Sequence, residues 1–406
     1  MNEQHAIARF EQFTVPAPVR TVVEALAQAG HQAFLVGGCV RDVLRGQPPK
    51  DFDVATSARP EQVQRLFRRV IPTGLEHGTV TVVQDKAHVE VTTFRAEAEY
   101  LDGRRPSKVE FHTDIEADLS RRDFTINAMA FDLVAKKLVD PFGGADDLRA
   151  RLVRCVRSAM ERFLEDGLRP MRAVRFATVL GFEIEPGTEA AIGQTLHVFR
   201  KVATERVNQE FTKMLLSPRV ATGLGLTRRT GLLAEFAPEA VDADFEAVAR
   251  TREELTLRLA VLLAGCPSAL AVVQRLKFPT KVATDVAHLV THQQLPAADA
   301  SDVELRRWLA KVKLEAAEPL LEVASALGRA DASVEERVRA QVAARPPLTT
   351  KALALNGAQV MEALGVGPSP LIGQATAFLL ERVLEEPSRN TPDSLRRLLE
   401  GFPRSG

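Results

Sequence analysis

The fold of the N-terminal part of the chain is decided by the stretch FLVGGCVRD, residues 34–42. Its first three residues are apolar and stop at Gly37 and Gly38, as at the end of a buried strand. The residues after the glycines predict the start of a helix, whose first amides can meet phosphate oxygens. Gly38 lets the backbone approach a ligand closely, because glycine has no Cβ. An ordinary glycine turn is the alternative interpretation.

The segments around this stretch predict further strands. Residues 51–55 (DFDVA) alternate with period two, and residues 79–83 and 89–94 are β-branched runs separated by Asp85-Lys86, a predicted hairpin. Residues 60–70 have helical spacing. After Asp147 the strand signals nearly vanish, and long segments with helical spacing follow. The sequence therefore predicts an α+β head with a small mixed or antiparallel sheet, followed by an all-α part.

Two aspartates beside the glycine stretch predict a metal site. Asp51 and Asp53 are two residues apart on an expected strand, so both side chains project from one face. Two carboxylates there repel each other unless a cation lies between them, and Mg²⁺ prefers oxygen ligands. Glu90 interrupts an otherwise apolar and Thr-rich strand and is the candidate third ligand. Solvated aspartates at a strand edge, and an outward-facing Glu90, are the alternatives.

Arginines are concentrated in one segment. Residues 149–177 contain eight arginines against three acidic residues, a local charge of +5 in a chain with equal numbers of basic and acidic residues. Asp166, Arg169, Arg172 and Arg175 are three residues apart, which predicts that they share one side of a helix. Arginine is suited to bidentate phosphate contacts. A solvated helix face is the alternative.

Composition excludes several classes of protein. The 406 residues suggest two to four domains, and the 53 basic and 53 acidic residues exclude an overall basic nucleic-acid-binding protein. The three cysteines are far apart, with no CxxC pair, which speaks against a disulfide framework or a structural zinc site. No apolar stretch is long enough to span a membrane, so we expect a cytoplasmic protein without a membrane partner.

Several motifs together resemble a known family. Besides 34–42 and 50–56, they are RRDFTINAM (121–129), DPFGG (140–144) and EDGLRPMRAVRF (165–176). These segments closely resemble class II tRNA nucleotidyltransferases, the template-independent CCA-adding enzymes that are grouped with bacterial poly(A) polymerases. The resemblance is strong over residues 30–220 and returns weakly at 357–390.

The resemblance implies four parts. They are a nucleotidyltransferase head (1–147), a helical neck that binds the nucleotide base and tRNA (148–215), a helical body (216–345) and a helical tail that binds tRNA (346–406). Some relatives carry a metal-binding His-Asp pair in the body, where this chain has Ala264 and Gly265. A body that keeps the helices without the metal pair, and no second hydrolytic activity, are therefore expected.

The resemblance also implies a reaction. The tRNA 3′-hydroxyl attacks the α-phosphate of CTP or ATP and releases pyrophosphate, with one Mg²⁺ held by Asp51 and Asp53 and a second on the triphosphate. Cytosine and adenine share an amine donor beside a ring-nitrogen acceptor, which a carboxylate and a guanidinium can read together. Asp166 and Arg169 match the residues with this role in the family. Helix capping is the alternative role for Asp166.

The remaining expectations concern the triphosphate and the specialisation. Arg41, Arg122, Arg172 and Arg175 are the expected partners of the triphosphate and ribose, beside Gly38. Residues 95–111 resemble the loop that family members use to switch from C to A, which disfavours a CC-adding enzyme. A poly(A) polymerase is also disfavoured, by residues 114–120. An A-adding enzyme remains open, an RNA-binding module without catalysis is the non-enzymatic alternative, and the sequence does not determine the oligomeric state.

Overall fold

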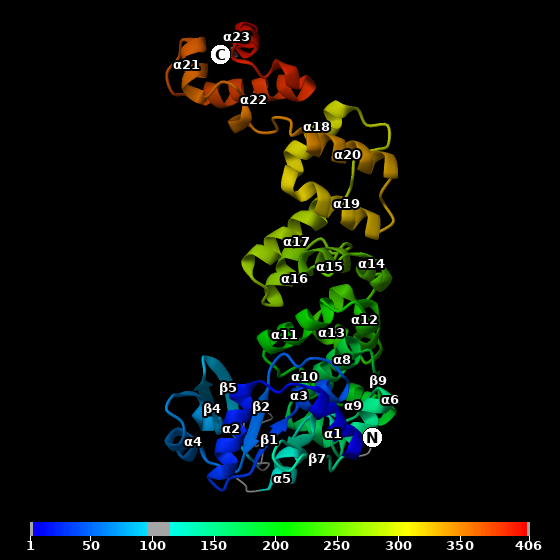
Figure 1. The fold of residues 1–406 in the computed structure, drawn as a ribbon. Coiled ribbons are helices and arrows are strands. Elements are labelled where there is room, and N and C mark those ends of the chain that lie inside the picture. Colours follow the sequence, from blue (N-terminus) through cyan, green and yellow to red (C-terminus); the bar gives the residue numbers. More distant parts are fainter. Residues whose placement is uncertain (1–2, 96–113, 404–406) are drawn as a thin grey trace. The chain divides into compact units, whose positions relative to one another are not determined.

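The chain divides into two compact units, Met1–Val241 and Asp242–Gly406, in a computed structural model that describes residues 3–95 and 114–403 (Figure 1). The expected switching loop therefore lies, apart from Arg95, outside the described residues. The four-part division expected from the resemblance stays a prediction.

The first unit contains a mixed seven-stranded sheet. Its strands are β1 (Ala33–Val36), β2 (Asp53–Thr56), β3 (Val70–Gly74), β4 (Thr79–Gln84), β5 (Ala87–Thr93), β6 (Ala130–Asp132) and β7 (Lys137–Val139), in the spatial order β3-β4-β5-β2-β1-β6-β7. Only the pairing of β2 with β5 is parallel. A further pair of short parallel strands consists of β8 (Leu152–Val153) and β9 (Glu183–Ile184).

Helices complete the first unit. They are α1 (Glu3–Gln12), α2 (Ala17–Gln28), α3 (Gly38–Leu44), α4 (Pro60–Leu66), α5 (Ile115–Ser120), α6 (Gly144–Ala150), α7 (Ala159–Glu165), α8 (Arg169–Leu180), α9 (Pro186–Gln194), α10 (Leu196–Phe199), α11 (Thr204–Leu215), α12 (Val220–Arg229) and α13 (Leu232–Phe236), with 3-10 turns η1 (Leu75–His77), η2 (Thr125–Asn127) and η3 (Pro238–Ala240). Helix α2 packs against β1, β4 and β5, and α3 packs against β1.

Strand β1 lies at the centre of this packing. All four of its residues are buried, because elements cover both faces of the sheet there. Phe34 and Val36 belong to an apolar cluster with Phe94, Leu119 and other buried residues. This rigid centre carries the glycine turn directly at its end, so the packing of the sheet positions the turn.

The expected α+β head and helical remainder are confirmed. The hairpin at Asp85-Lys86 is also confirmed, since both residues have positive φ and join β4 to β5. Three local expectations were wrong. Strand β2 begins at Asp53 and excludes Asp51, helix α4 ends at Leu66, and the β8–β9 pair interrupts the part expected to be all-α.

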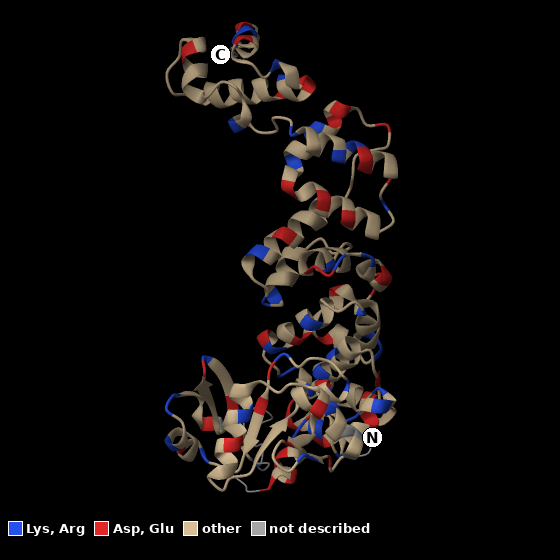
Figure 2. Cartoon of the chain, in the orientation of Figure 1, with Lys and Arg blue, Asp and Glu red and all other residues tan. Residues whose placement is uncertain are grey.

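The second unit contains helices and no strand among its described residues. Its helices are α14 (Phe245–Arg250), α15 (Leu255–Leu262), α16 (Ala269–Arg275), α17 (Thr280–His292), α18 (Asp302–Val312), α19 (Ala317–Ala326), α20 (Ala332–Ala344), α21 (Gly357–Leu364), α22 (Pro370–Glu385) and α23 (Pro392–Glu400), with 3-10 turns η4 (Leu314–Ala316), η5 (Thr350–Ala352) and η6 (Pro387–Arg389). Lys/Arg and Asp/Glu are intermixed on these helices (Figure 2).

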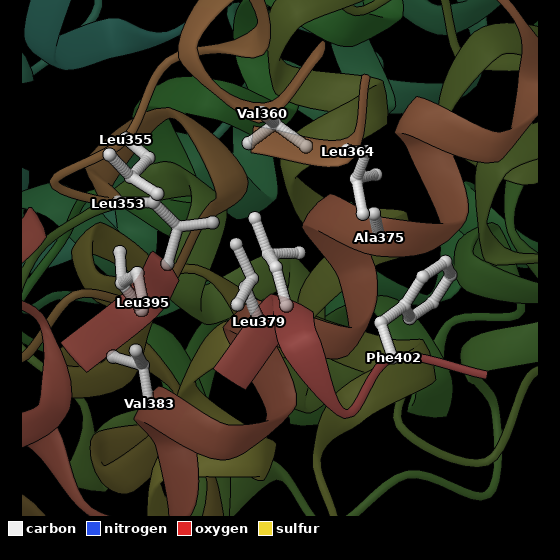
Figure 3. Packing of buried hydrophobic residues seen from close by; sticks show 10 residues of the cluster. Leu353, Leu355, Val360, Leu364, Ala375, Leu379, Val383, Leu395 and Phe402 are labelled. Atoms are coloured by element: carbon white, nitrogen blue, oxygen red, sulfur yellow. The ribbon is translucent and has the colours of Figure 1, made fainter. Parts of the chain in front are cut away.

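Two apolar clusters hold the later helices of this unit. One joins α18, α19 and α20, and the last residues of α22 contribute Leu384 to it. The other is formed by α21, α22, α23 and the segment before them, whose side chains point toward one another around Leu379 (Figure 3). Among the described residues, no helix combines the length and apolar character needed to cross a bilayer.

Candidate active site

One pocket of the first unit collects most of the residues expected to bind the nucleotide. It has a volume of about 350 Å³ and lies where β1 and β2 meet α3, η2 and α8. The lining residues are Gly37, Gly38, Arg41, Asp53, Arg122, Asp123, Asn127, Asp166, Arg169, Arg172 and Phe176. Asp51, Glu90 and Arg175, which the sequence also singled out, do not line it.

The glycine turn forms one wall of this pocket. Gly37 has a φ of +72°, a conformation that favours glycine. A Cβ built at Gly37 would lie 2.8 Å from Nη1 of Arg122, so a larger residue would displace that guanidinium. Helix α3 begins at Gly38, as expected. The turn therefore places the backbone close to the guanidinium of Arg122 at the C-terminal end of β1.

Three acidic residues, Asp51, Asp53 and Glu90, lie on or next to the paired parallel strands β2 and β5, and we call them the acidic edge of the site. Asp53 of β2 is the register partner of Glu90 on β5, so their side chains lie on the same face of the sheet. Partial burial raises the pKa of Asp53, and the negative charge of Asp51 raises it further. Burial also raises the pKa of Glu90, and so do the charges of Asp53 and Asp51. Three carboxylates thus repel one another here.

This arrangement fits a divalent cation that is shared with a phosphate-bearing ligand. Among the described residues, no group of three or more His, Cys, Asp or Glu side chains is placed to hold one ion by itself. Mg²⁺ in such sites is held by one or two carboxylates together with substrate phosphates. Asp53 and Asp51 have carboxylate oxygens of this kind, and their role as ligands stays a prediction. Whether Glu90 adds a third stays a prediction.

A buried ion pair supports the floor of the pocket. Asp123 is 8% exposed and accepts hydrogen bonds from Nε of Arg172 at 2.8 Å and from Nδ2 of Asn127 at 3.2 Å. Burial alone would raise the pKa of Asp123, but the charge and hydrogen bond of Arg172 outweigh it and lower this pKa to about 2. Asn127 in turn accepts a hydrogen bond from Nη1 of Arg41 at 2.7 Å. This network orients two arginines of the pocket.

Sequence reasoning did not single out Asp123, Asn127 or Phe176. Asp123 and Asn127 belong to the RRDFTINAM segment, from which only Arg122 was assigned a role. The available signal was that these two polar residues alternate with the apolar residues Phe124, Ile126 and Ala128. Their arginine partners, Arg41 and Arg172, are distant in the sequence, so the network itself was not predictable from the segment.

Asp166 and Arg169 lie together but not as a helical row. Asp166 follows the last residue of α7, and Arg169 is the first residue of α8, so the expectation that Asp166 shares a helix face was wrong. One carboxylate oxygen of Asp166 accepts from the amide of Leu168 at 3.0 Å. Arg169 is buried and donates to Glu165 at 2.6 Å and to two backbone carbonyls.

Arg169 nevertheless keeps donors for a ligand. A guanidinium has five N–H groups, and within the described part of the chain three of those of Arg169 are used. Asp166 and Arg169 both line the pocket. A carboxylate acceptor and a guanidinium donor are therefore available side by side, which is the pair expected for reading an amine next to a ring nitrogen.

Arg175, the last arginine of the expected row, does not line the pocket and contacts residues next to it. Nε of Arg175 donates to the buried carboxylate of Glu210 on α11 at 2.7 Å, and its guanidinium lies 3.5 Å from the ring centre of Phe176. Arg169, Arg172 and Arg175 are each paired with a carboxylate of the protein. These three arginines are therefore not a solvated helix face.

The charge of the pocket also favours a cation-bearing ligand. Its lining contains four arginines and three aspartates, so the two signs nearly cancel. A nucleoside triphosphate carries several negative charges, which this lining alone does not neutralise. Divalent cations bound to such a triphosphate would supply the missing positive charge.

Three family models match successive parts of the chain. Residues 33–154 match the model described as "Poly A polymerase head domain", residues 181–243 match "Probable RNA and SrmB-binding site of polymerase A", and residues 250–399 match "tRNA nucleotidyltransferase domain 2 putative". The first match covers the sheet and the acidic edge, and the others cover helical segments.

Curated proteins and solved structures agree with these matches. The CCA-adding enzyme of Limosilactobacillus fermentum is 37% identical over 391 residues, covering 92% of this chain and 94% of that protein. That of Geobacillus stearothermophilus is 36% identical over 384 residues, with the same coverage. The structure of the Bacillus stearothermophilus CCA-adding enzyme in complex with CTP has a TM-score of 0.80, 33% identity, and coverage of 95% of this chain and 98% of that chain. This chain belongs to the family of CCA-adding enzymes.

Proposed function

We propose that this chain adds C, C and A in turn to the 3′ end of tRNA, from CTP and ATP, and releases pyrophosphate. The observation that carries the proposal is that Asp53 of the acidic edge lines the same pocket as Asp166 and Arg169. One nucleotide bound there would lie near the proposed metal-binding carboxylate of Asp53 and also near the base-reading pair, Asp166 and Arg169. The relatives named CCA-adding enzymes support the same reaction.

Asp51 and Asp53 are the residues that would hold Mg²⁺, with Glu90 as a further candidate. A bound divalent cation lowers the pKa of the attacking hydroxyl and stabilises the charge of the leaving pyrophosphate. The raised pKa of Asp53 and the repulsion around it support this assignment, because a cation relieves both the burial and the repulsion of these carboxylates.

The triphosphate would lie against the glycine turn. Gly37 and Gly38 allow close approach of the backbone, and Arg41, Arg122 and Arg172 line the same wall. Asp123 and Asn127 hold Arg172 and Arg41 in place, so these guanidiniums are oriented before the nucleotide arrives. The reacting phosphate is thus positioned by donors whose geometry is already set, which favours the in-line attack. Arg175 would act indirectly, by holding α8 to Glu210.

Selection of the base would rest on Asp166 and Arg169. The carboxylate accepts from the amine of cytosine or adenine, and the guanidinium donates to the ring nitrogen. Uracil and guanine place a carbonyl opposite the carboxylate and an N–H opposite the guanidinium. An acceptor then faces an acceptor and a donor faces a donor, so neither hydrogen bond forms. Such mismatches reduce the incorporation of these bases by about 10-fold or more.

Incorporation on three tRNAs tests the proposal. Purified protein with Mg²⁺ receives tRNA lacking CCA, tRNA ending in the first C, or tRNA ending in CC, each with CTP, ATP or both. Growth of the shortest substrate to CCA, resolved nucleotide by nucleotide, is the expected result. Addition of a single A to the tRNA ending in CC, with no addition to the other two, would replace the proposal by an A-adding enzyme. No addition to any substrate would contradict it.

The Asp53→Ala variant tests the metal assignment. We expect it to lose incorporation by about 10³-fold or more, because the hydroxyl is no longer activated, while affinity for tRNA stays within about twofold. Single-turnover incorporation and filter binding measure the two quantities. A variant that keeps its turnover would remove Asp53 from the metal site.

A further inference from the structure

Arg206 contacts the base-reading carboxylate from a different helix. It lies in the first turn of α11, and its Nη2 donates to Oδ2 of Asp166 at 2.8 Å. The other oxygen of the carboxylate, Oδ1, accepts from the backbone amide of Leu168 at 3.0 Å. Within residues 3–95 and 114–403, each oxygen of Asp166 therefore has one donor of its own, one from the chain just after it and one from α11.

These two donors determine the orientation of the carboxylate. A carboxylate with one donor can rotate about its Cβ–Cγ bond, but separate donors on its two oxygens restrict that rotation. Each oxygen has two lone pairs, so the described part of the chain leaves one acceptor position per oxygen for a ligand. Asp166 can therefore keep both protein donors and still accept a hydrogen bond from a nucleobase amine.

The helix that carries Arg206 is itself attached to the wall of the pocket. Glu210, one turn further along α11, is 4% exposed and accepts from Arg175 of α8 at 2.7 Å. Phe211 of α11 is buried as well. Arg206 thus extends from a helix whose position relative to α8 is set by a buried ion pair and by apolar packing.

We propose that Arg206 is a positioning residue that sets the selection of amine-bearing bases, by holding the carboxylate of Asp166 in its base-reading orientation. The proposal rests on the proposed function and extends it to a residue outside the pocket. Arg206 is not part of the pocket lining, and its side chain is 46% exposed. It acts on the substrate through Asp166 and does not contact the reacting atoms.

The test compares Arg206→Ala and Arg206→Lys with a matched control, Arg229→Ala. Arg229 is an exposed arginine of the same unit that donates to Glu189 at 2.7 Å, away from the pocket. Single-nucleotide incorporation of CTP and of UTP is measured on tRNA lacking CCA, with KM and kcat determined separately. Thermal unfolding of every variant is recorded beside the kinetics.

We expect Arg206→Ala to lower kcat/KM for CTP by about three- to tenfold, chiefly through KM, because one charged hydrogen bond that orients Asp166 is lost. The value for UTP stays the same or rises, so discrimination falls by at least the same factor. Arg206→Lys, which keeps one charged donor, retains more discrimination than the alanine variant. Arg229→Ala matches the unmodified protein.

A double-mutant cycle separates this role from a general effect on the fold. In the Asp166→Ala background, Arg206→Ala should change the CTP-to-UTP ratio by less than about twofold, since the group on which it acts is absent. An equal loss of discrimination in both backgrounds would overturn the proposal, and so would an alanine variant that folds and keeps full discrimination. If the unmodified protein adds neither C nor A to any tRNA, it is the proposed function that fails.

Discussion

At the scale of the residue, the pocket depends on charges that are buried in pairs. Asp123 is the clearest case, because Arg172 lowers its pKa to about 2 in spite of its burial. A carboxyl whose pKa is lower in the folded than in the unfolded state stabilises the fold above its unfolded pKa. That contribution is lost as the pH falls toward the folded pKa. Asp123 therefore contributes to stability above about pH 4 and loses that contribution between about pH 4 and pH 2.

The Asp123→Asn variant should show this pH dependence. We expect it to be less stable than the unmodified protein by about 2–3 kcal/mol at pH 7, with the difference shrinking by about 1 kcal/mol between pH 5 and pH 3. Calorimetric unfolding over this pH range measures both. Asp146→Asn, at an exposed aspartate, is the control and should change little. A difference that stays constant down to pH 3 would mean that the charge of Asp123 is not the cause.

At the scale of the element, the β4–β5 hairpin contains the strand that carries Glu90. Its two turn residues, Asp85 and Lys86, have φ values of +48° and +69°, and Gln84 pairs with Ala87 on either side of them. Two-residue turns with positive φ at both positions favour Asn-Gly or Asp-Gly, because their twist matches that of the strands. The lysine is the less suited of the two residues here.

Lys86→Gly should therefore stabilise the first unit. We expect a gain of about 0.5–1 kcal/mol, since a left-handed conformation is strained for lysine and not for glycine, with no change in nucleotide incorporation. Thermal unfolding gives the comparison. Lys86→Ala is the matched control, because alanine removes the charge and keeps the backbone strain. If alanine stabilises as much as glycine, the cause is the charge and not the backbone.

At the scale of the whole molecule, the nucleotide pocket and the helices after Asp242 belong to different units. Every residue that lines the pocket lies between Gly37 and Phe176, within Met1–Val241. The second unit has apolar clusters of its own, including the one around Leu379. A unit with its own core is expected to fold by itself.

A fragment of residues 1–241 should bind CTP as the full chain does. We expect a Kd for CTP with Mg²⁺ within about threefold of that of the full chain, because the pocket is complete in the fragment. Incorporation into tRNA should fall, since the domain that matches tRNA nucleotidyltransferase domain 2 is removed. Calorimetric titration and incorporation assays measure the two. A folded fragment without CTP affinity would contradict the assignment of the pocket to this unit.

Local patterns sufficed for part of this site. The strand 34–36, its stop at Gly37-Gly38 and the hairpin at Asp85-Lys86 follow from apolar runs and turn residues, which act between neighbours along the chain. The resemblance of several motifs then indicated which residues to expect in the nucleotide pocket. Arg41, Arg122 and Arg169 are among the lining residues that were named with that resemblance, whereas Arg175 was also expected there and does not line the pocket.

The sequence by itself determined the order of strands and helices around the glycine turn and the kinds of residue that the pocket contains. Only the tertiary structure decided how they are used. The register of two strands places Asp53 opposite Glu90, and Arg172 forms an ion pair with Asp123. Asp166 lies between two helices, where it forms an ion pair with Arg206. These contacts join residues about 35–50 positions apart, and spacing along the chain reports only on neighbours within a turn or a strand.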